Sequence, residues 1–320
     1  MATRSARLMI EALARHHLSA AELRGLTHPQ TDPALLVRLR RGEVSKHKLL
    51  LELVRRRVRR ERPAGAAARL EEALSSLNDV ADGRVGAWCV GALAALDAGA
   101  PVNVGDLLPG RAPARVRSSA DGLALEVTLD AGDPCLERLG LTAEPLDVAL
   151  WQRELDAAWR LLVTRHRRMA EGIGVTVDRI VPLAARPGGA TSGWAFGTVG
   201  IGLPASRAEP SRLAESLVHE HRHLVLSAIM DQVQLTRAPA ARRYPSPWRR
   251  EPRPIDGVLQ GCFAHLAVAA FWRGGRETAA FESAYADTAA ATATLAASGA
   301  LTEAGQVIVE EVQRLLDGWS

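Results

Sequence analysis

Apolar residues recur three and four positions apart over most of the chain, a spacing typical of amphipathic helices. These runs are rich in leucine, alanine and arginine, whose side chains lose little freedom in a helix. They cover residues 5–59, 70–77, 85–96, 146–169, 255–272 and 288–297, and the last is expected to form a terminal helix. The pattern predicts a mainly α fold.

Alternation of apolar and polar residues with period two is short and local. It covers residues 114–129 and is interrupted by Asp121-Gly122, a pair that favours a tight hairpin turn. Residues 180–183 and 196–203 predict two further short strands, on either side of a glycine-rich loop. We therefore expect a few short β-strands beside the helices.

The expected elements divide the chain into three parts. Residues 1–110 form an N-terminal helical region, and residues 111–145 form a short β-rich connection. Residues 146–320 form a mostly helical region, which is expected to carry the functional site. No internal repeat and no long low-complexity linker interrupts this order.

The composition indicates an ordinary globular protein, with 47% hydrophobic and 24% charged residues. Its three cysteines, odd in number and widely spaced, predict reduced thiols in a cytoplasm and offer no cysteine metal motif. The N-terminus lacks the pattern of a signal peptide, and charges are expected to interrupt the apolar runs before they reach membrane-spanning length. We therefore expect a cytoplasmic protein without a membrane partner.

The formal net charge of +4 is spread over dispersed arginines, so a nucleic-acid partner is not expected. The densest basic cluster runs from Arg55 to Arg62 and ends before Pro63. We interpret it as a solvated helix end rather than a phosphate-binding patch. An acidic, helical leader peptide would also fit its charge.

The motif with the clearest chemistry lies in a strongly helical, apolar stretch at residues 210–226. It reads His219-Glu220-x-x-His223, and residues four apart project from the same side of a helix. Two neutral imidazoles at that spacing beside a glutamate form the HExxH arrangement that binds zinc in many metallopeptidases. The sequence therefore predicts a mononuclear metal site held by His219 and His223.

A third protein ligand has to come from elsewhere in the chain. The extended metzincin motif is excluded, because Leu226 and Ile229 stand where it needs glycine and histidine. Residues 255–272 contain no glutamate of the thermolysin type but do contain His265 on an expected apolar helix. We predict His265 as the third ligand, and we expect His221, on another face of its helix, to be exposed or outside the ligand set.

The loop between these two helices, residues 242–254, is dense in arginine and contains four prolines. Planar guanidinium groups bind carboxylates through two parallel hydrogen bonds. A rigid basic loop beside an open metal site suits a carboxylate cosubstrate or an acidic peptide. The alternative is a surface loop whose arginines pair with Glu251 or Asp256.

The C-terminal half of the chain resembles the HExxH motif-containing peptide-modification proteins, which accompany ribosomally made, post-translationally modified peptides and are sometimes fused to radical SAM maturases. Trp88 extends the similarity more weakly upstream. The matching stretches are 151–162, Ser192 with Ala195-Phe196-Gly197, Leu217-Val218-His219-Glu220 to His223, Trp248-Arg249, Glu251-Pro252-Arg253-Pro254, and Gly257 through Leu259-Gln260-Gly261 and Ala264-His265 to Phe271-Trp272. The run His221-Arg222 departs from the family, which often has an apolar or aromatic residue followed by glutamine.

The resemblance implies an Fe(II)- and 2-oxoglutarate-dependent hydroxylase that acts on the β-carbon of a residue in a ribosomal precursor peptide. His219, His223 and His265 would then hold the iron, and Glu220 would orient a ligand or bound water. One or more of Arg249, Arg250 and Arg253 would receive the distal carboxylate of 2-oxoglutarate. A radical SAM maturase of the same pathway is a further expected partner.

The competing reading is a zinc peptidase in which Glu220 is the general base toward a metal-bound water. Three histidines also suit Zn²⁺, so the ligands alone do not decide between the metals. Tyr244 or an arginine of the basic loop could stabilise the oxyanion in that reaction. Ser192, Trp248 and Gln260 complete the set of expected substrate-binding or ligand-supporting residues, although Gln260 could equally be a helix-packing amide.

Overall fold

The computed structural model describes residues 18–75, 80–105, 113–131, 146–184, 189–203, 209–237, 241–273 and 277–319. It confirms the mainly α fold: the chain is 65% helical, with ten helices in the described ranges and a few short strands. The helices are α2 (Ala20–Thr27), α3 (Pro33–Glu61), α4 (Ala64–Ser75), α5 (Gly83–Asp97), α7 (Val148–Arg165), α8 (Arg167–Thr176), α9 (Pro210–Gln232), α10 (Ile255–Trp272), α11 (Thr278–Ala297) and α12 (Glu303–Asp317). Residues 5–17, Cys135 and residues 186–188, which belonged to predicted features, lie outside the described ranges.

Five short strands form one mixed sheet in the order β1-β2-β3-β5-β4. Neighbours β2 and β3, and β3 and β5, are parallel, whereas β1 and β4 run antiparallel to their neighbours. Strand β4 is therefore an edge strand, and it contacts α9. The strands are β1 (Ala114–Ala120), β2 (Leu123–Leu129), β3 (Arg179–Pro182), β4 (Gly189–Thr191) and β5 (Thr198–Ile201).

The predicted β elements are confirmed. Strands β1 and β2 form the expected hairpin, and both turn residues have positive φ, 41° at Asp121 and 79° at Gly122. Asp-Gly pairs favour this conformation because glycine has no Cβ to clash and aspartate tolerates it better than most residues. Strands β3 and β5 are buried along their whole length, and their one charged residue, Arg179, pairs with Asp82 and Asp130.

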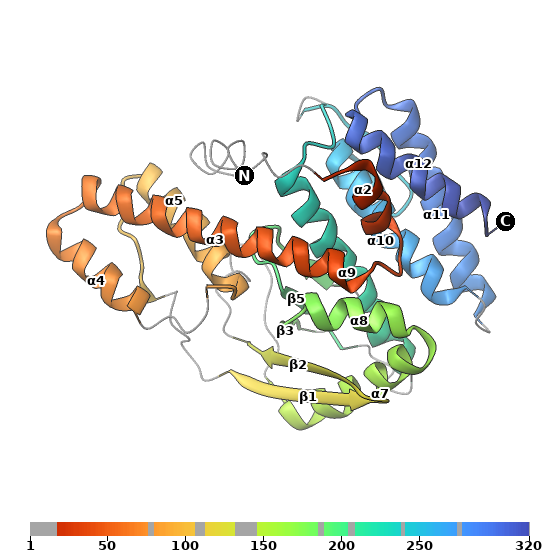
Figure 1. Ribbon diagram of the computed structural model, residues 1–320, viewed down its shortest axis with the longest axis horizontal. Coiled ribbons are helices and arrows are strands. Elements are labelled where there is room, and N and C mark those ends of the chain that lie inside the picture. Colours follow the sequence, from red (N-terminus) through yellow and green to blue (C-terminus); the bar gives the residue numbers. More distant parts are fainter. Residues whose placement is uncertain are drawn as a thin grey trace.

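Helix α9 lies at the centre of the main body and packs against α3, α7, α8 and α10 (Figure 1). Helix α10 in turn packs between α9 and α11, and α12 covers α2 and α11. The main hydrophobic core fills the space among these helices and one face of the sheet. The two helices that carry the predicted ligands are therefore the best supported elements of the fold.

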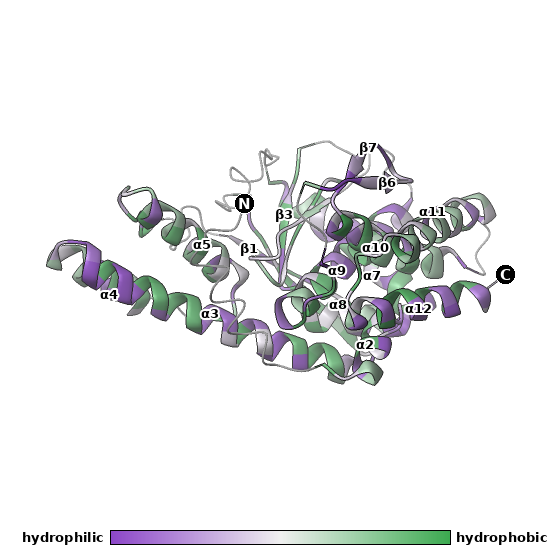
Figure 2. Cartoon of the chain, turned by 90° about the horizontal axis from the view of Figure 1, so that it is seen from above, coloured by the Kyte–Doolittle hydropathy of each residue, from purple (hydrophilic) through white to green (hydrophobic). Residues whose placement is uncertain are grey.

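A second, smaller hydrophobic core lies in an arm, formed by residues 50–75 and 83–105, that projects from the main body (Figures 1 and 2). Helix α3 links the two cores: Leu36 and Leu39 near its start join the main core, whereas Leu50, Val54 and Val58 join the core of the arm. Helices α4 and α5 pack on this distal part of α3. The arm contributes no residue to the predicted metal site.

A buried ion-pair cluster fixes α3 to α9. Lys46, 1% exposed, donates to the Asp231 carboxylate at 2.6 Å and to the Gly193 carbonyl at 3.0 Å. It also pairs with Glu43, one turn earlier on α3. Because an unpaired buried charge costs several kcal/mol, this cluster holds α3, α9 and the loop after β4 in one arrangement.

Two predictions about helices are wrong. Residues 146–169 do not form one helix, since α7 ends and α8 begins at His166, where φ is −135°. The His166 ring packs against Phe271 with ring centroids 4.5 Å apart, a long-range contact that local spacing does not reveal. The alanine-rich run at 288–297 is not the terminal helix either, because it is the end of α11 and is followed by α12.

Helix α10 reaches the length and apolarity of a minimal membrane span, contrary to the expectation that charges interrupt every such run. However, 72% of it is buried inside the protein. Its apolar composition is therefore accounted for by its position between α9 and α11.

Candidate metal centre

Helix α9 brings the first two predicted ligands together. Pro210 occupies its first turn, and apolar residues hold the helix in the main core. The Nε2 atoms of His219 and His223 are 3.1 Å apart. Two nitrogens bound to one ion at about 2.0–2.1 Å would lie about this far apart, so the pair fits a common metal ion.

Both imidazoles are held in the neutral form that metal binding requires. Burial lowers the pKa of His219 well below its ordinary value, and the neighbouring His223 and His265 lower it further. Burial also lowers the pKa of His223, against the opposing effect of its hydrogen bond with Gln260. Neutral imidazoles keep a nitrogen lone pair available as a ligand.

A chain of hydrogen bonds orients His223 through Nδ1, the ring nitrogen that does not face His219. Its Nδ1 lies 2.8 Å from Gln260 Oε1, and the amide nitrogen of Gln260 donates to Ser227 Oγ at 3.1 Å. An amide oxygen can only accept, so this contact places the proton on Nδ1 and leaves Nε2 free to bind metal. Gln260 on α10 thus supports a candidate ligand on α9.

Glu220 completes the cluster: one ligand atom each of His219, Glu220 and His223 lies within 4.8 Å of the others. The glutamate is 2% exposed, and its Oε2 has no hydrogen-bond partner. Burial raises its pKa to about 8, opposed by a hydrogen bond with Thr191. A bound cation would reverse this effect and favour the carboxylate.

Edge strand β4 closes the site over Glu220. A Cβ at Gly189 would lie about 2.5 Å from the Glu220 side chain, so this close approach requires glycine. Sequence reasoning missed both Gly189 and Thr191, although they directly precede Ser192 in a glycine-rich segment. The signal was the unexplained density of glycines between two predicted strands.

His265 lies beside this cluster rather than within it. Its ring centroid is 5.3 Å from that of His219, and its Nδ1 is buried without a partner. Burial lowers its pKa, against the opposing charge of Asp287 on α11. The indole of Trp248 stacks on its imidazole, with ring centroids 4.8 Å apart and planes 9° from parallel.

The basic segment between α9 and α10 is a hairpin rather than an irregular loop, with strands β6 (Tyr244–Ser246) and β7 (Arg249–Arg253). It lies against α10, where Figure 2 shows it as a largely hydrophilic element. Two glycines of α10 make room for it: a Cβ at Gly261 would overlap the Trp248 indole, and one at Gly257 would lie 3.2 Å from Arg253 Nε. Gly257 and Gly261, the glycine face of α10, therefore let the hairpin pack closely on this helix.

The arginines of β7 have no acidic partner in the described part of the chain. Arg249 and Arg250 are exposed, Arg253 is half-buried, and none of them forms an ion pair there. The alternative that they pair with Glu251 or Asp256 is not supported, because neither carboxylate forms an ion pair with them, and Asp256 instead accepts from Thr236 Oγ1 at 2.5 Å. The charge of Arg253 lowers the pKa of His223, which places this arginine within electrostatic reach of the cluster.

Two other predicted residues have local roles away from the ligand cluster. Ser192 Oγ accepts from the Trp194 backbone N–H at 3.3 Å in the turn after β4. Tyr244 is buried in the main core, with the Arg242 guanidinium 5.0 Å from its ring centroid. Neither side chain has a recorded contact with the histidines.

His221, which was expected to be exposed or outside the ligand set, is buried, and so is Arg222 beside it. His221 is 4% exposed, and burial, with the charge of Arg222, lowers its pKa to about 3. Arg222 donates to the carbonyls of Leu26 and Thr27 at the end of α2, at 2.7 and 2.9 Å. Arg222 therefore joins α9 to the end of α2, whereas the His221 ring lies next to Gly172 of α8.

No protein-family model matches the chain, and no curated protein shows significant similarity to it. The family resemblance rests on the residues quoted for it.

Proposed function

We propose that this protein is an Fe(II)- and 2-oxoglutarate-dependent oxygenase that hydroxylates the β-carbon of a residue in a ribosomally made precursor peptide. The observation that carries the proposal is an unpaired basic hairpin seated directly beside a cluster of neutral histidines. A hydrolase needs no such hairpin, whereas a reaction with a dicarboxylate cosubstrate needs a cation at a fixed distance from its metal.

His219, His223 and His265 are the residues that would hold the iron. Three imidazoles leave coordination positions open, which a bidentate keto acid and dioxygen both require. The metal and 2-oxoglutarate would supply the oxidising power: one oxygen atom of O₂ enters the new hydroxyl group, and the other enters succinate as CO₂ leaves. Gln260 keeps His223 in the ligating tautomer, and Trp248 keeps the His265 ring in place.

Arg253 is the best placed of the three arginines to receive the distal carboxylate of 2-oxoglutarate. It lies over Gly257 on α10, its charge reaches His223, and it is less exposed than Arg249 or Arg250. A less hydrated guanidinium binds a carboxylate more strongly. Arg249 would raise the positive potential around it, since burial and then the charge of Arg249 lower the pKa of Arg253.

Glu220 has a supporting role in this reaction. Its carboxylate faces His219 at 4.0 Å and is enclosed by Gly189 and Thr191. From there it would accept a hydrogen bond from a bound water or a substrate amide. It would also contribute negative charge toward a divalent cation.

A zinc peptidase is the second candidate, and one observation favours it: Glu220 lies within the same cluster as both histidines, where a general base would be needed. On that reading Glu220 would take a proton from a metal-bound water. One arginine of β7 could stabilise the oxyanion in that reaction, but a peptidase has no dicarboxylate cosubstrate to require the others.

Turnover with each metal separates the two candidates. The Fe(II) protein should form succinate from 2-oxoglutarate only in the presence of O₂, and the His223→Ala variant should form none. Release of peptide fragments by the Zn²⁺ protein, lost in Glu220→Gln, without succinate formation from the Fe(II) protein, would favour the peptidase instead.

A further inference from the structure

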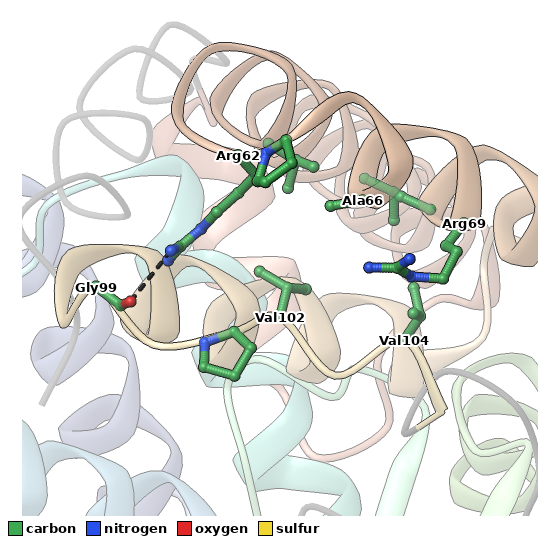
Figure 3. Close-up of a pocket in the computed structure, with 10 residues that line it drawn as sticks. Arg62, Ala66, Arg69, Gly99, Val102 and Val104 are labelled. Atoms are coloured by element: carbon green, nitrogen blue, oxygen red, sulfur yellow. Dashed lines mark hydrogen bonds between the residues drawn. The ribbon is translucent and has the colours of Figure 1, made fainter.

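The arm contains a cavity of about 250 Å³ that is separate from the metal centre. It lies between the end of α3, the face of α4 and the chain that follows α5. Figure 3 shows Val102 and Val104 on one side of it and Ala66 on another, with Arg62 and Arg69 at its ends. Most of the lining is apolar, and the charged groups stand at the rim.

The arginines around this cavity differ in whether they have hydrogen-bond or ion-pair partners. The arginines from Arg55 to Arg62 are all engaged within the arm, by Glu52, Glu61, Glu71, Asp97 and the carbonyls of Gly99 and Ala100. The interpretation of this run as an open basic patch for an acidic leader is therefore not supported. Arg69, in contrast, is exposed and has no partner among the described residues, and it reaches over the cavity (Figure 3).

We propose that this cavity docks a peptide segment in which an apolar side chain stands next to an acidic one. The apolar side chain enters between Ala66 and Val102, and the carboxylate pairs with Arg69. The cavity is smaller than the roughly 300–1,000 Å³ of pockets that enclose a whole small molecule, so its size suits one or two side chains of a peptide.

The net charge of the arm supports an acidic occupant. Residues 50–75 and 83–105 contain eight arginines and five carboxylates, so internal pairing leaves a positive excess. A positive rim around an apolar floor attracts a negatively charged segment and then buries its apolar side chain. A basic or uniformly apolar segment would be disfavoured.

This docking proposal rests on the proposed function in one respect: the docked segment is taken to belong to the peptide substrate. The ion-pair cluster at Lys46 fixes α3 to α9, so the cavity has a set position relative to His219 and His223. Sixteen residues separate Lys46 from Arg62, a rise of about 24 Å along the helix. The cavity therefore lies about 24 Å along α3 from the point where this helix is tied to α9, a distance that an extended chain covers with at least about seven residues.

A display library of random twelve-residue peptides, selected on the metal-free full-length protein, tests the docking directly. The change Ala66→Trp fills the cavity, whereas Ala68→Trp places the same ring on an exposed position of α4 outside it. Peptides enriched on the wild type should carry an apolar residue next to Asp or Glu. Their affinity should fall at least about tenfold with Ala66→Trp and stay within about twofold with Ala68→Trp.

The change Arg69→Glu should weaken the same peptides about fivefold or more, and more strongly at low salt. Equal binding to the wild type and to Ala66→Trp, or enrichment of peptides without the acidic-apolar pair, would overturn the proposal. The His223→Ala variant should still bind the selected peptides. Peptide docking can therefore be lost while the metal centre stays active, and the metal centre can be lost while docking is kept. The two proposals are thus tested separately.

Discussion

Trp248 and His265 face each other with their rings almost parallel, 9° apart, and their centroids 4.8 Å apart. The same indole fills the space above Gly261, one turn before His265 on α10. One side chain thus connects the basic hairpin, the glycine face of α10 and the predicted third ligand. The position of the hairpin and the orientation of His265 should change together.

The change Trp248→Ala should weaken metal binding about tenfold, because His265 loses the surface that holds its ring. Trp248→Phe keeps an aromatic face and should stay within about threefold of the wild type. Competition with a chelator measures both affinities. Equal affinities of Trp248→Ala and the wild type would show that the stacking does not support a ligand.

The two glycines of α10 provide a matched pair of variants. Gly261→Ala should displace the indole from His265, destabilise the fold by about 1–3 kcal/mol and weaken metal binding. Gly257→Ala meets only the flexible Arg253 side chain, at 3.2 Å, and should leave metal affinity unchanged. Chemical denaturation and metal titration measure these effects, and similar losses of metal affinity in the two variants would contradict the seating described for Trp248.

Gln260 should support metal binding through its hydrogen bond with His223. Gln260→Leu removes the acceptor for Nδ1 and should lower metal affinity about 10- to 100-fold, whereas Gln260→Glu keeps an acceptor and should retain more of it. Metal titration together with melting temperatures separates this effect from instability. If Gln260→Leu lowered stability without lowering metal affinity, the residue would be a helix-packing amide.

Arg253 should bind the cosubstrate more strongly than its neighbours do. Arg253→Ala should weaken binding of 2-oxoglutarate to the Fe(II) protein about 10- to 100-fold, as expected for loss of a charged pair. Arg250→Ala, the matched control on the same strand, should change it about threefold or less. Anaerobic titration with 2-oxoglutarate compares the two, and a larger loss in Arg250→Ala would reverse the assignment.

The buried cluster at Lys46 predicts a pH dependence of stability. Burial, and then the charge of Asp231, raises the pKa of Glu43 above its ordinary value, while Lys46 lowers it. The folded state therefore keeps a proton that the unfolded chain has lost, so the stability that Glu43 contributes falls as pH rises through this range. The free energy of unfolding of the wild type minus that of Glu43→Gln should therefore decrease as the pH rises from about 5 to about 8.

Denaturation curves at the two pH values test this dependence. Glu52→Gln, a more exposed position on the same helix, is the control, because hydrogen bonding to Arg56 lowers the pKa of Glu52. The difference in stability between the wild type and Glu52→Gln should not decrease with rising pH in the way expected for Glu43→Gln. A pH-independent difference between the wild type and Glu43→Gln would mean that Glu43 is charged in the folded state.

Features that depend on local spacing could be predicted from the sequence. The four-residue separation of His219 and His223 on an apolar helix brings their Nε2 atoms together, and Asp121-Gly122 forms the turn of the hairpin. In each case the relevant partner is a few residues away. The geometry then follows from the helix or the turn itself.

Features that depend on distant partners could not be predicted. His221 was expected to be exposed or outside the ligand set, and only the helices packed around α9 show that it is buried. The arginines from Arg55 to Arg62 resemble a free basic patch until the carboxylates of α4 and α5 are placed beside them. The arginines of β7 look similar in sequence yet have no such partners in the described ranges, and only the fold separates the two groups.

The most direct test of the central claim is the visible spectrum of the anaerobic protein with Fe(II) and 2-oxoglutarate. The proposed oxygenase predicts the weak charge-transfer absorption of a keto acid chelated to iron, and its loss in the His265→Ala variant. The absence of this band from a wild-type protein that binds Zn²⁺ tightly would contradict the account and favour a peptidase that uses Glu220.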